Sequence, residues 1–390
     1  MLSEELAGEK VGVCVSGGLS CLTVAAWLAA SSVPTLGFVA DIGQADHEDV
    51  RGMARSLEAA GVATVVVDLR DEIARLALDL VRYQARYDGG YWNTTSGSRM
   101  VLVAGLADAM RRAGCTVLAH GCVGGGNDQR RFERYVTALA PDLRAVSPWT
   151  DPGLLARFPG RSDMAEYLRD RGLAADQRST ADYSADGSLA GFAHDGAALE
   201  CLQTPDAAAW WALTLAPRQA PDKPEPVTVT VAGGRPAAIG NAPGEARELL
   251  ERANSIAGRH GVGLRSVVEN RINGTKCRGV YEAPGLDLLG FCVARVYQVV
   301  MDPDALRLMH GLSEMMGRGV YEGRYFDPAI RAARAAADVL IDSAGATAEV
   351  VTELYKGGIS FQGLSHGPGE PVAPRQTRFT GGGHHWQIVA

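Results

Sequence analysis

A short segment near the start of the chain has the residue types of an anion-binding loop. Ser16-Gly17-Gly18 stands between an alternating apolar run, residues 11–15, and residues 19–28, which have the apolar pattern of a helix. Glycines let the backbone approach a phosphate, and a helix N-terminus offers free N–H groups and a favourable dipole. Ser16 and Ser20 add hydroxyl donors. The segment predicts a phosphate site, although a plain turn explains a short glycine motif equally well on its own.

A second glycine-rich segment, residues 120–133, has the sequence HGCVGGGNDQRRFE. Gly121 and residues 124–126 allow close backbone approach, and the polar residues 127–131 follow in the first turn of a helix. A turn with a solvated polar cap is the alternative interpretation. Two glycine-rich turns at strand ends of one sheet are nevertheless what a nucleotide site needs. Residues 87–99 are too polar for a core segment, and their hydroxyls suit a small polar ligand.

The elements that must position these segments alternate between strand and helix. Such β-α-β units predict a parallel sheet covered by helices, with ligands at the carboxyl ends of the strands. Residues 16–18, 40–44 and the loop after His120 fall at those ends. After residues 11–15, the expected strands are 35–40, 63–68 and 116–120, and the expected helices are 47–60, 71–83 and 101–113.

The second half of the chain has a different pattern. Residues 227–231 alternate as a half-buried strand, Gly233-Gly234 marks a turn and residues 236–239 return, which predicts a hairpin. Residues 244–258 are expected to be helical, and 183–186 and 193–196 to be loops or short strands. We expect a nucleotide-binding α/β domain over 1–175, an α+β domain over 176–365 and an irregular tail over 366–390.

Composition excludes several classes of function. The chain of 390 residues is 46% hydrophobic and 21% charged, which is typical of a soluble globular protein. Its net charge of −7 argues against nucleic acid as a partner. No apolar run reaches the length of a membrane span, and the first residues lack a signal pattern. Seven scattered cysteines without a CxxC pair predict reduced thiols in a cytoplasmic protein.

Several motifs taken together resemble the argininosuccinate synthase family, within the ATP pyrophosphatases that carry an SGG loop. In order and spacing they cover roughly residues 10–365, and the joint match is far more specific than any one motif. They are the loop at 16–19, Ala40–Gln44, the segment 120–133, Ala140–Leu143, and the segments 257–263, 268–271, 276–282 and 354–357.

The resemblance implies a parallel-sheet domain of the adenine nucleotide alpha hydrolase type, followed by an α+β catalytic and multimerisation domain. It implies a ligase that uses ATP and Mg²⁺ to join citrulline to aspartate, assembled as a homo-oligomer, usually a tetramer. The family usually ends in a helix that reaches a neighbouring subunit. Residues 366–390 show no helical pattern, which puts that contact in doubt.

The resemblance also implies roles for individual residues, and no dedicated metal ligand is assigned. Asn127, Asp128 and Arg131 are the expected catalytic residues. The expected ATP contacts are Cys14, Ser16, Gly17, Gly18, Leu19, Ser20, Cys21, Ala40 and Gly121. Citrulline is expected at Tyr91, Ser96, Asn127, Arg131, Ser184, Glu269 and Tyr281, and aspartate at Thr95, Val123, Asn127 and Asp128. A structural salt bridge is the alternative for Arg131 and Glu269.

The chain departs from the family at its phosphate loop. Family members have SGGLDTS where this chain has SGGLSCL, so Ser20, Cys21 and Leu22 replace an acidic and two hydroxyl residues. Val123 replaces a threonine, Gly125 a lysine and Ala193 a citrulline-contacting serine. Each lost hydrogen bond to a charged group is worth roughly 1.5–3 kcal/mol, so several together could cost orders of magnitude in rate.

Three hypotheses therefore compete. The first is a working argininosuccinate synthase with a divergent loop. The second is a ligase of the same fold, in a specialised biosynthetic pathway, that passes the activated group to another amine or uses another substrate. The third is a non-catalytic ligand-binding protein. Retention of Asn127, Asp128, Arg131, Glu269 and Tyr281 argues against the third, because such a protein has little physical need for so many polar groups in one pocket.

Overall fold

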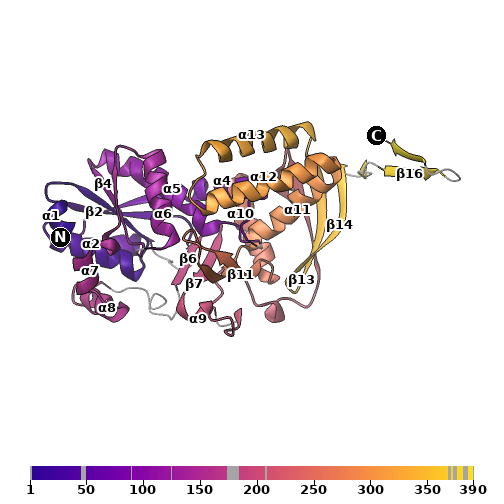
Figure 1. Cartoon of the computed structure of the whole chain (residues 1–390). Coiled ribbons are helices and arrows are strands. Elements are labelled where there is room, and N and C mark those ends of the chain that lie inside the picture. Colours follow the sequence, from indigo (N-terminus) through magenta and orange to yellow (C-terminus); the bar gives the residue numbers. More distant parts are fainter. Residues whose placement is uncertain are drawn as a thin grey trace.

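A computed structural model describes most of the chain. The described residues are 2–44, 50–88, 90–123, 125–173, 184–206, 209–367, 370–371, 376–380 and 385–389. Two lobes lie side by side, with the N-terminal elements in one and the C-terminal elements in the other (Figure 1). None of the helices in the described ranges has the length and apolar character needed to cross a membrane.

The N-terminal lobe is built on a parallel sheet of five strands in the order β3-β2-β1-β4-β5. This arrangement confirms the predicted fold class. Because β1 is central, its carboxyl end lies between those of β2 and β4, where the phosphate loop begins. The strands are β1 (Val11–Val15), β2 (Thr35–Asp41), β3 (Thr64–Asp68), β4 (Val117–His120) and β5 (Arg144–Val146).

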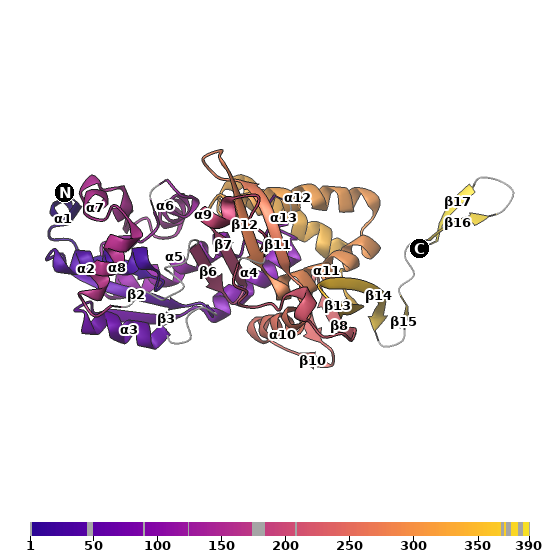
Figure 2. The same cartoon turned by 90° about the horizontal axis from the view of Figure 1, so that it is seen from below.

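Helices cover both faces of this sheet (Figure 2). The alternation along β1 decides which residues face which helices. Val11, Val13 and Val15 pack in one cluster with residues of α2 and α8, whereas Cys14 packs in another with residues of α4 and α5. The helices of this lobe are α1 (Leu2–Glu5), α2 (Leu19–Ala30), α3 (Val50–Ala59), α4 (Arg70–Arg82), α5 (Thr94–Arg112), α6 (Asn127–Leu139), α7 (Pro152–Arg157) and α8 (Arg161–Arg169).

The C-terminal lobe contains two antiparallel sheets. The four-stranded sheet, in the order β11-β12-β7-β6, lies beside the N-terminal lobe and packs against α5. Its strands are β6 (Ser184–Ser188), β7 (Gly191–Asp195), β11 (Leu264–Asn270) and β12 (Lys276–Glu282). The segments predicted as loops or short strands are therefore strands, and Tyr183 lies outside the described residues.

The second sheet has six strands in the order β10-β9-β8-β13-β14-β15, and it includes the predicted β8–β9 hairpin. Its strands are β8 (Glu225–Ala232), β9 (Arg235–Ile239), β10 (Ala242–Pro243), β13 (Ala348–Tyr355), β14 (Gly358–Gly367) and β15 (Glu370–Pro371). The helices of this lobe are α9 (Ala197–Glu200), α10 (Ala246–Arg259), α11 (Pro284–Val300), α12 (Pro303–Tyr321) and α13 (Pro328–Ser343).

Two expectations differ from the structure. The tail over 366–390, expected to be irregular, contains β15 and an antiparallel hairpin of β16 (Gln376–Thr380) and β17 (His385–Val389). The polar segment 87–99 is largely buried: Tyr91, Trp92 and Ser96 are at most 3% exposed. The helix expected from residue 101 begins at Thr94 and draws this segment into the interior. The assignment of domains to 1–175 and 176–365 stays a prediction.

Candidate active site

The phosphate loop has the backbone geometry of a strand-to-helix turn. Gly17 has a φ of +82°, a left-handed conformation that favours glycine, and Gly18 caps the N-terminus of α2. Ser16 is exposed, and the first N–H groups of α2 have no partner within the helix. These features are those of an anion site at a helix N-terminus.

The side chains of the altered loop point in different directions. The Cys21 sulfur accepts from the Ser16 N–H at 3.2 Å and lies 3.0 Å from the Gly18 carbonyl oxygen, so it closes the loop from inside. Leu22 is buried, and the Thr23 hydroxyl donates to the Leu19 carbonyl at 2.8 Å. Of the altered positions, only Ser20 keeps a partly exposed hydroxyl.

The remaining predicted ATP contacts lie around this loop. Cys14 pairs with His120 across β1 and β4, which brings Gly121 onto the first turn of α2. A Cβ at Gly121 would lie 2.4 Å from the Cys21 Cα, so only glycine fits there. Ala40 lies near the end of the neighbouring β2, and its carbonyl accepts from the Gln44 side chain at 3.0 Å. The Cys14 thiol is buried, and burial raises its pKa to about 12, so only main-chain groups of Cys14 are available to a ligand.

His120 orients the start of the second glycine-rich loop. Its Nδ1 accepts from the Cys122 N–H at 3.3 Å, its Nε2 lies 2.9 Å from the Ser147 hydroxyl, and its ring stacks on Phe132. Burial lowers the pKa of His120 to about 4, so the imidazole is neutral at physiological pH. We assign His120 a structural role.

The polar side chains of Asn127, Glu269, Tyr281 and Tyr321 form one cluster where α6, β11, β12 and α12 meet, and we call this cluster the polar pocket. The Glu269 carboxylate accepts from the Tyr281 hydroxyl at 2.9 Å and from the Tyr321 hydroxyl at 2.6 Å. Burial raises the pKa of Glu269, and the two hydroxyls oppose that shift. Asn127 donates to the Tyr321 hydroxyl at 2.9 Å and accepts from the Ile272 N–H. Glu269, Tyr281 and Asn127, three of the predicted ligand contacts, therefore belong to one hydrogen-bonded network.

A buried ion network borders this pocket. Asp128 accepts from Arg131 at 2.7 Å and from Arg99 at 2.9 Å, and Arg99 also pairs with Asp186 of β6. Burial raises the pKa of Asp128, but the charges of Arg99 and Arg131 outweigh burial and hold the pKa below its usual value. Asp128 is thus an ionised carboxylate that is already neutralised by two guanidinium groups.

The start of α5 lies against the same pocket. The Tyr91 hydroxyl accepts from the N–H groups of Thr95 and Ser96, and the Tyr91 ring stacks on Tyr281 with 4.1 Å between centroids. The Ser96 hydroxyl oxygen is buried and has no hydrogen-bond partner within the described chain. An unpartnered buried hydroxyl is unusual, and a ligand atom would satisfy it.

Two predicted contacts, Ser184 and Val123, and the altered position Ala193 lie outside the hydrogen-bonded network formed by the described side chains. Ala193 lies in β7 opposite Tyr281 and is buried. Ser184 begins β6, and nothing of its side chain is described. Val123, in the loop after β4, is 63% exposed, so it presents an apolar side chain to solvent.

The structure adds residues that the sequence did not single out. Tyr321 ends α12 and joins the polar network, and Arg99 and Asp186 extend the ion network. Both additions depend on contacts between residues far apart in the chain. The segment 318–326, RGVYEGRYF, carries no local pattern that would have indicated a site.

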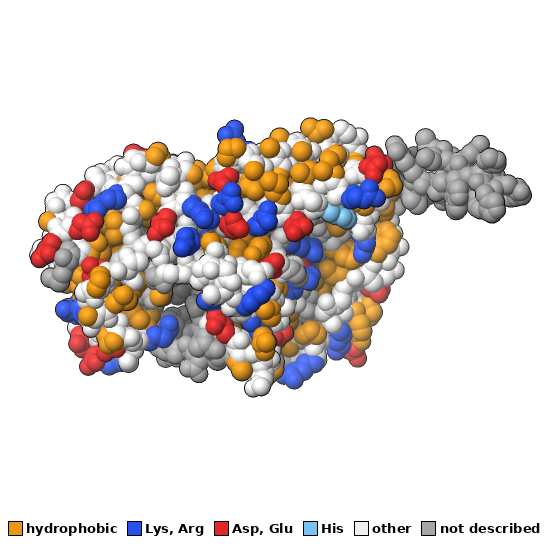
Figure 3. All heavy atoms as spheres, in the orientation of Figure 1, with side chains coloured by type: hydrophobic (Ala, Val, Ile, Leu, Met, Phe, Trp, Pro, Cys, Tyr) orange, Lys and Arg blue, Asp and Glu red, His pale blue; other side chains and the backbone are white. Residues whose placement is uncertain are grey.

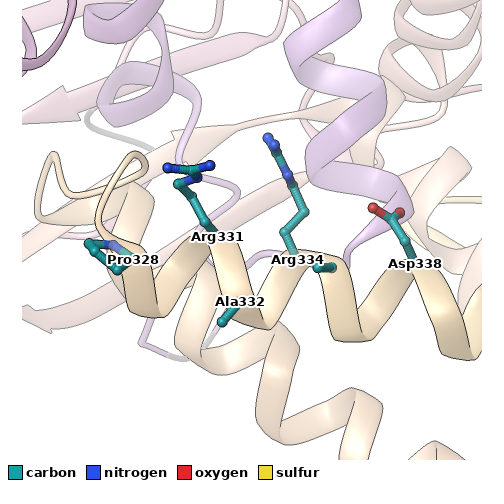
Figure 4. A pocket seen from close by; sticks show the side chains of 6 residues that line it. Pro328, Arg331, Ala332, Arg334 and Asp338 are labelled. Carbon is teal, nitrogen blue, oxygen red and sulfur yellow. The ribbon is translucent and has the colours of Figure 1, made fainter.

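Two concave regions lie along helices of the C-terminal lobe, and the second adjoins the polar network because Tyr87 stacks on Tyr321. A groove of about 450 Å³ runs along α13, where Arg331, Arg334 and Asp338 point to the same side (Figure 4). Asp338 accepts there from Arg82, the last residue of α4, and from Tyr83, which follows it. A second cavity of about 720 Å³ lies between α11, α12 and the segment 84–90 and includes Tyr87. Neither contains a predicted ligand contact.

No group of three or more His, Cys, Asp or Glu side chains is arranged to hold a metal ion in the described parts of the chain. The loop geometry fits phosphates through main-chain N–H groups and the hydroxyls of Ser16 and Ser20. A magnesium ion is commonly bound through substrate phosphates with few protein ligands.

Comparison with known proteins gives the family. Residues 10–174 match the Arginosuccinate synthase N-terminal HUP domain, and residues 183–366 match the Arginosuccinate synthase C-terminal domain. The argininosuccinate synthase of Idiomarina loihiensis is 35% identical over 355 residues, which cover 90% of this chain and 86% of the relative. That of Edwardsiella ictaluri is 35% identical over 353 residues, covering 90% and 85%.

A third relative, the argininosuccinate synthase of Serratia proteamaculans, is 33% identical over 356 residues, which cover 90% of this chain and 86% of the relative. Both halves of the chain match in order, and the resemblance noted from the motifs is confirmed. The chain belongs to the argininosuccinate synthase family of ATP-using carbon–nitrogen ligases.

Proposed function

We propose that this protein activates the ureido group of citrulline with ATP and joins it to the amine of aspartate. The observation that carries the proposal is that Glu269 and Arg131 both hydrogen-bond to Tyr321, which places a carboxylate suited to an ammonium near a guanidinium suited to a carboxylate. A zwitterionic amino acid matches that pair of charges.

The reaction has two balanced steps. The ureido oxygen attacks the α-phosphorus of ATP, the bond to the β-phosphate oxygen breaks, and pyrophosphate leaves. The aspartate amine then attacks the activated carbon, AMP leaves with the bonding electron pair, and the amine loses a proton. Little acid–base machinery is needed, so the protein contributes mainly by holding the ligands in line and stabilising phosphate charge.

Arg131 and Glu269 keep bonding capacity for such a ligand. Arg131 uses Nη1 on Asp128 and Nε on the Tyr321 carbonyl, and no hydrogen bond of its Nη2 is found among the described residues. Glu269 Oε1 accepts from the Tyr321 hydroxyl and, at 3.6 Å, from the Cys277 thiol, whereas Oε2 accepts from the Tyr281 hydroxyl and keeps a lone pair for an ammonium. Tyr91 and Ser96 would complete the citrulline contacts.

ATP would bind at the phosphate loop and bring Mg²⁺ with it as part of the substrate. The main-chain groups of Gly17, Gly18 and Gly121 and the hydroxyls of Ser16 and Ser20 would contact it. Magnesium neutralises phosphate charge when bound. Main-chain groups at Ala40 would lie beside the rest of the nucleotide.

A specific observation favours a second candidate, a ligase that uses another acceptor amine. Val123 exposes an apolar side chain on the side assigned to aspartate, and Asp128 is already neutralised by two arginines. Both features make this side of the site less polar than we would expect for binding an acceptor that carries two carboxylates. An acceptor with an apolar side chain would suit Val123 better.

Pyrophosphate release from MgATP tests the proposal. We expect release that requires citrulline, and formation of argininosuccinate when aspartate is added. Release that requires citrulline but ignores aspartate would support the second candidate. If no pyrophosphate is released while calorimetry detects binding of citrulline or ATP, the protein is a non-catalytic ligand-binding homologue.

The assembly and compartment belong to the same proposal. A homotetramer in the cytoplasm is the state that family membership suggests. Light scattering of the purified full chain measures the first of these properties.

A further inference from the structure

Tyr321 occupies the centre of the polar pocket, although it enters from the end of a distant helix. It is the last residue of α12 and is 1% exposed. The segments that it contacts come from α6, β11 and the region before α5. One side chain therefore touches three separate parts of the chain.

The Tyr321 hydroxyl has a fixed direction of hydrogen bonding. It lies 2.9 Å from the Asn127 side-chain nitrogen, which can only donate, and 2.6 Å from a Glu269 oxygen, which accepts. Burial and the nearby Glu269 charge raise the pKa of Tyr321, so the hydroxyl keeps its proton. The Asn127 amide, the tyrosine and the glutamate thus form one chain of directed hydrogen bonds.

Tyr321 also holds Arg131. Its carbonyl oxygen accepts from Arg131 Nε at 2.6 Å, and the guanidinium lies over its ring, 4.6 Å from the centroid. Tyr87 stacks on the same ring with 3.7 Å between centroids and 14° between planes. The ring is therefore held in place independently of its hydroxyl.

We infer that Tyr321 is a positioning residue that fixes the orientation of Asn127, Glu269 and Arg131 together and keeps Glu269 ionised for an ammonium-bearing substrate. This inference rests on the proposed function for the identity of that substrate. The role differs from a catalytic one, because Tyr321 acts through the residues that would touch citrulline.

The protonation state of Glu269 depends on the hydroxyls that donate to it and on the charged groups around it. Two hydroxyls stabilise the carboxylate, and one of them belongs to Tyr321. Loss of that hydroxyl would therefore raise the Glu269 pKa further above its ordinary value. The titratable and charged groups that face Glu269 are Tyr321, Tyr281, Cys277, Arg131, Asp195 and Tyr87.

The test compares Tyr321→Phe with Tyr297→Phe in the full chain. Phenylalanine keeps the ring contacts and removes only the hydroxyl. Tyr297 is a matched control, because it is also 1% exposed and its hydroxyl donates to a carbonyl at 2.6 Å outside the pocket. Calorimetry of citrulline between pH 5 and pH 8 and carbon NMR of glutamate-labelled protein, assigned with Glu269→Gln, supply the readouts.

For Tyr321→Phe we expect citrulline affinity to fall by about 10-fold or more, the usual effect of losing a hydrogen bond to a charged group. The pH at which citrulline affinity falls on acidification should rise, and the midpoint of the Glu269 titration by NMR should rise with it. ATP affinity should stay unchanged, and Tyr297→Phe should move none of these quantities.

Failure of the proposed substrate and failure of the role of Tyr321 give different results. If the wild-type protein binds no citrulline, the proposed substrate is wrong, and the NMR titration still decides the role of Tyr321. An unchanged Glu269 titration in Tyr321→Phe, or an equal shift in Tyr297→Phe, would overturn the inference. Unchanged citrulline affinity in Tyr321→Phe alongside wild-type binding would do the same.

Discussion

Asp128 was predicted to contact a ligand, and the structure also gives it a charge-balancing role. The motif suggested a ligand contact, whereas the carboxylate lies between Arg99 and Arg131 and balances their charges. Its loss would take a carboxylate partner from both arginines, although Arg99 would still pair with Asp186. Asp128 therefore contributes to stability whatever it contributes to binding.

We expect Asp128→Asn to lower the free energy of unfolding by about 2 kcal/mol, less than for a fully buried pair because the carboxylate keeps some solvent contact. Asp142→Asn is the control, since its pair with Arg111 is exposed to solvent and should lower the free energy of unfolding by much less. Urea unfolding at pH 7 measures both. Equal losses in the two variants would contradict the network's importance.

His120 predicts a pH dependence of stability. Its pKa is lowered by burial from 6.5 to about 4, so the unfolded chain binds the proton more readily than the folded one. Stability is therefore lost as pH falls below 6.5, by about 2 kcal/mol between pH 7 and pH 5 from this group alone. Urea unfolding of wild type and His120→Gln at both values measures the difference. The variant should lose less stability on acidification, and equal losses would refute the assignment.

The sequence indicated many residues of the candidate site but not the residues that position their side chains. Glu269 and Arg131 were identifiable because they lie in recognisable motifs. Tyr321 and Asp186 were not, since their importance arises only when α12 and β6 fold against the N-terminal lobe. Long-range contacts of this kind leave no local pattern in composition or spacing.

At the scale of elements, the β1–loop–α2 unit was predictable because glycines and apolar alternation encode it locally. The segment 87–99 was not, because its polar groups find distant partners. The Trp92 indole donates to Asp287 at 2.7 Å, and the Asn93 amide donates to the Gly317 carbonyl at 2.9 Å. With those partners supplied, a polar segment can be buried.

The contact between Gly121 and α2 supplies a prediction for the loop as a unit. An added methyl group would meet the Cys21 backbone at 2.4 Å, so Gly121→Ala must displace the phosphate loop. We expect the KM for ATP to rise by about 10-fold or more, because misplaced donors lose their hydrogen bonds to phosphate. Gly311→Ala is the control, since nothing lies within 4 Å of its added Cβ. Wild-type kinetics in Gly121→Ala would show that the loop does not bind ATP.

The altered loop supplies a second prediction at this scale. Ser20 lies in the first turn of α2 and is partly exposed, so Ser20→Asp would restore a carboxylate that could help to hold the magnesium ion of the proposed MgATP. A carboxylate at that position also suits the helix dipole. We expect pyrophosphate release to speed up by roughly 10-fold, as one added electrostatic contact does in other enzymes. No gain would indicate that the loop is built for another purpose.

For the whole molecule, the candidate site depends on both lobes. Asn127, Asp128 and Arg131 come from α6, whereas Glu269, Tyr281 and Tyr321 come from the C-terminal elements. Charged side chains of both signs are interspersed over the face seen in Figure 3. Since the site residues contact one another across the lobes, the site exists only when the two lobes are packed together.

The lobes also share a hydrophobic core. Leu80 and Val81 of α4 belong to the same buried cluster as Leu286, Leu289 and Val293 of α11. A continuous apolar interface makes the two halves unfold together, unlike domains joined by a polar contact. Calorimetry of the full chain should therefore show one transition, with equal calorimetric and van't Hoff enthalpies per cooperative unit.

The fragment 1–175 supplies the complementary measurement, because it would expose the α4 surface that α11 covers. It should bind a hydrophobic dye and unfold at a lower temperature than the full chain. Two separate transitions in the full chain, one matching the fragment, would show instead that the lobes are independent. Binding at the interlobe site would then need the lobes to dock first, and citrulline would raise the temperature of both transitions together.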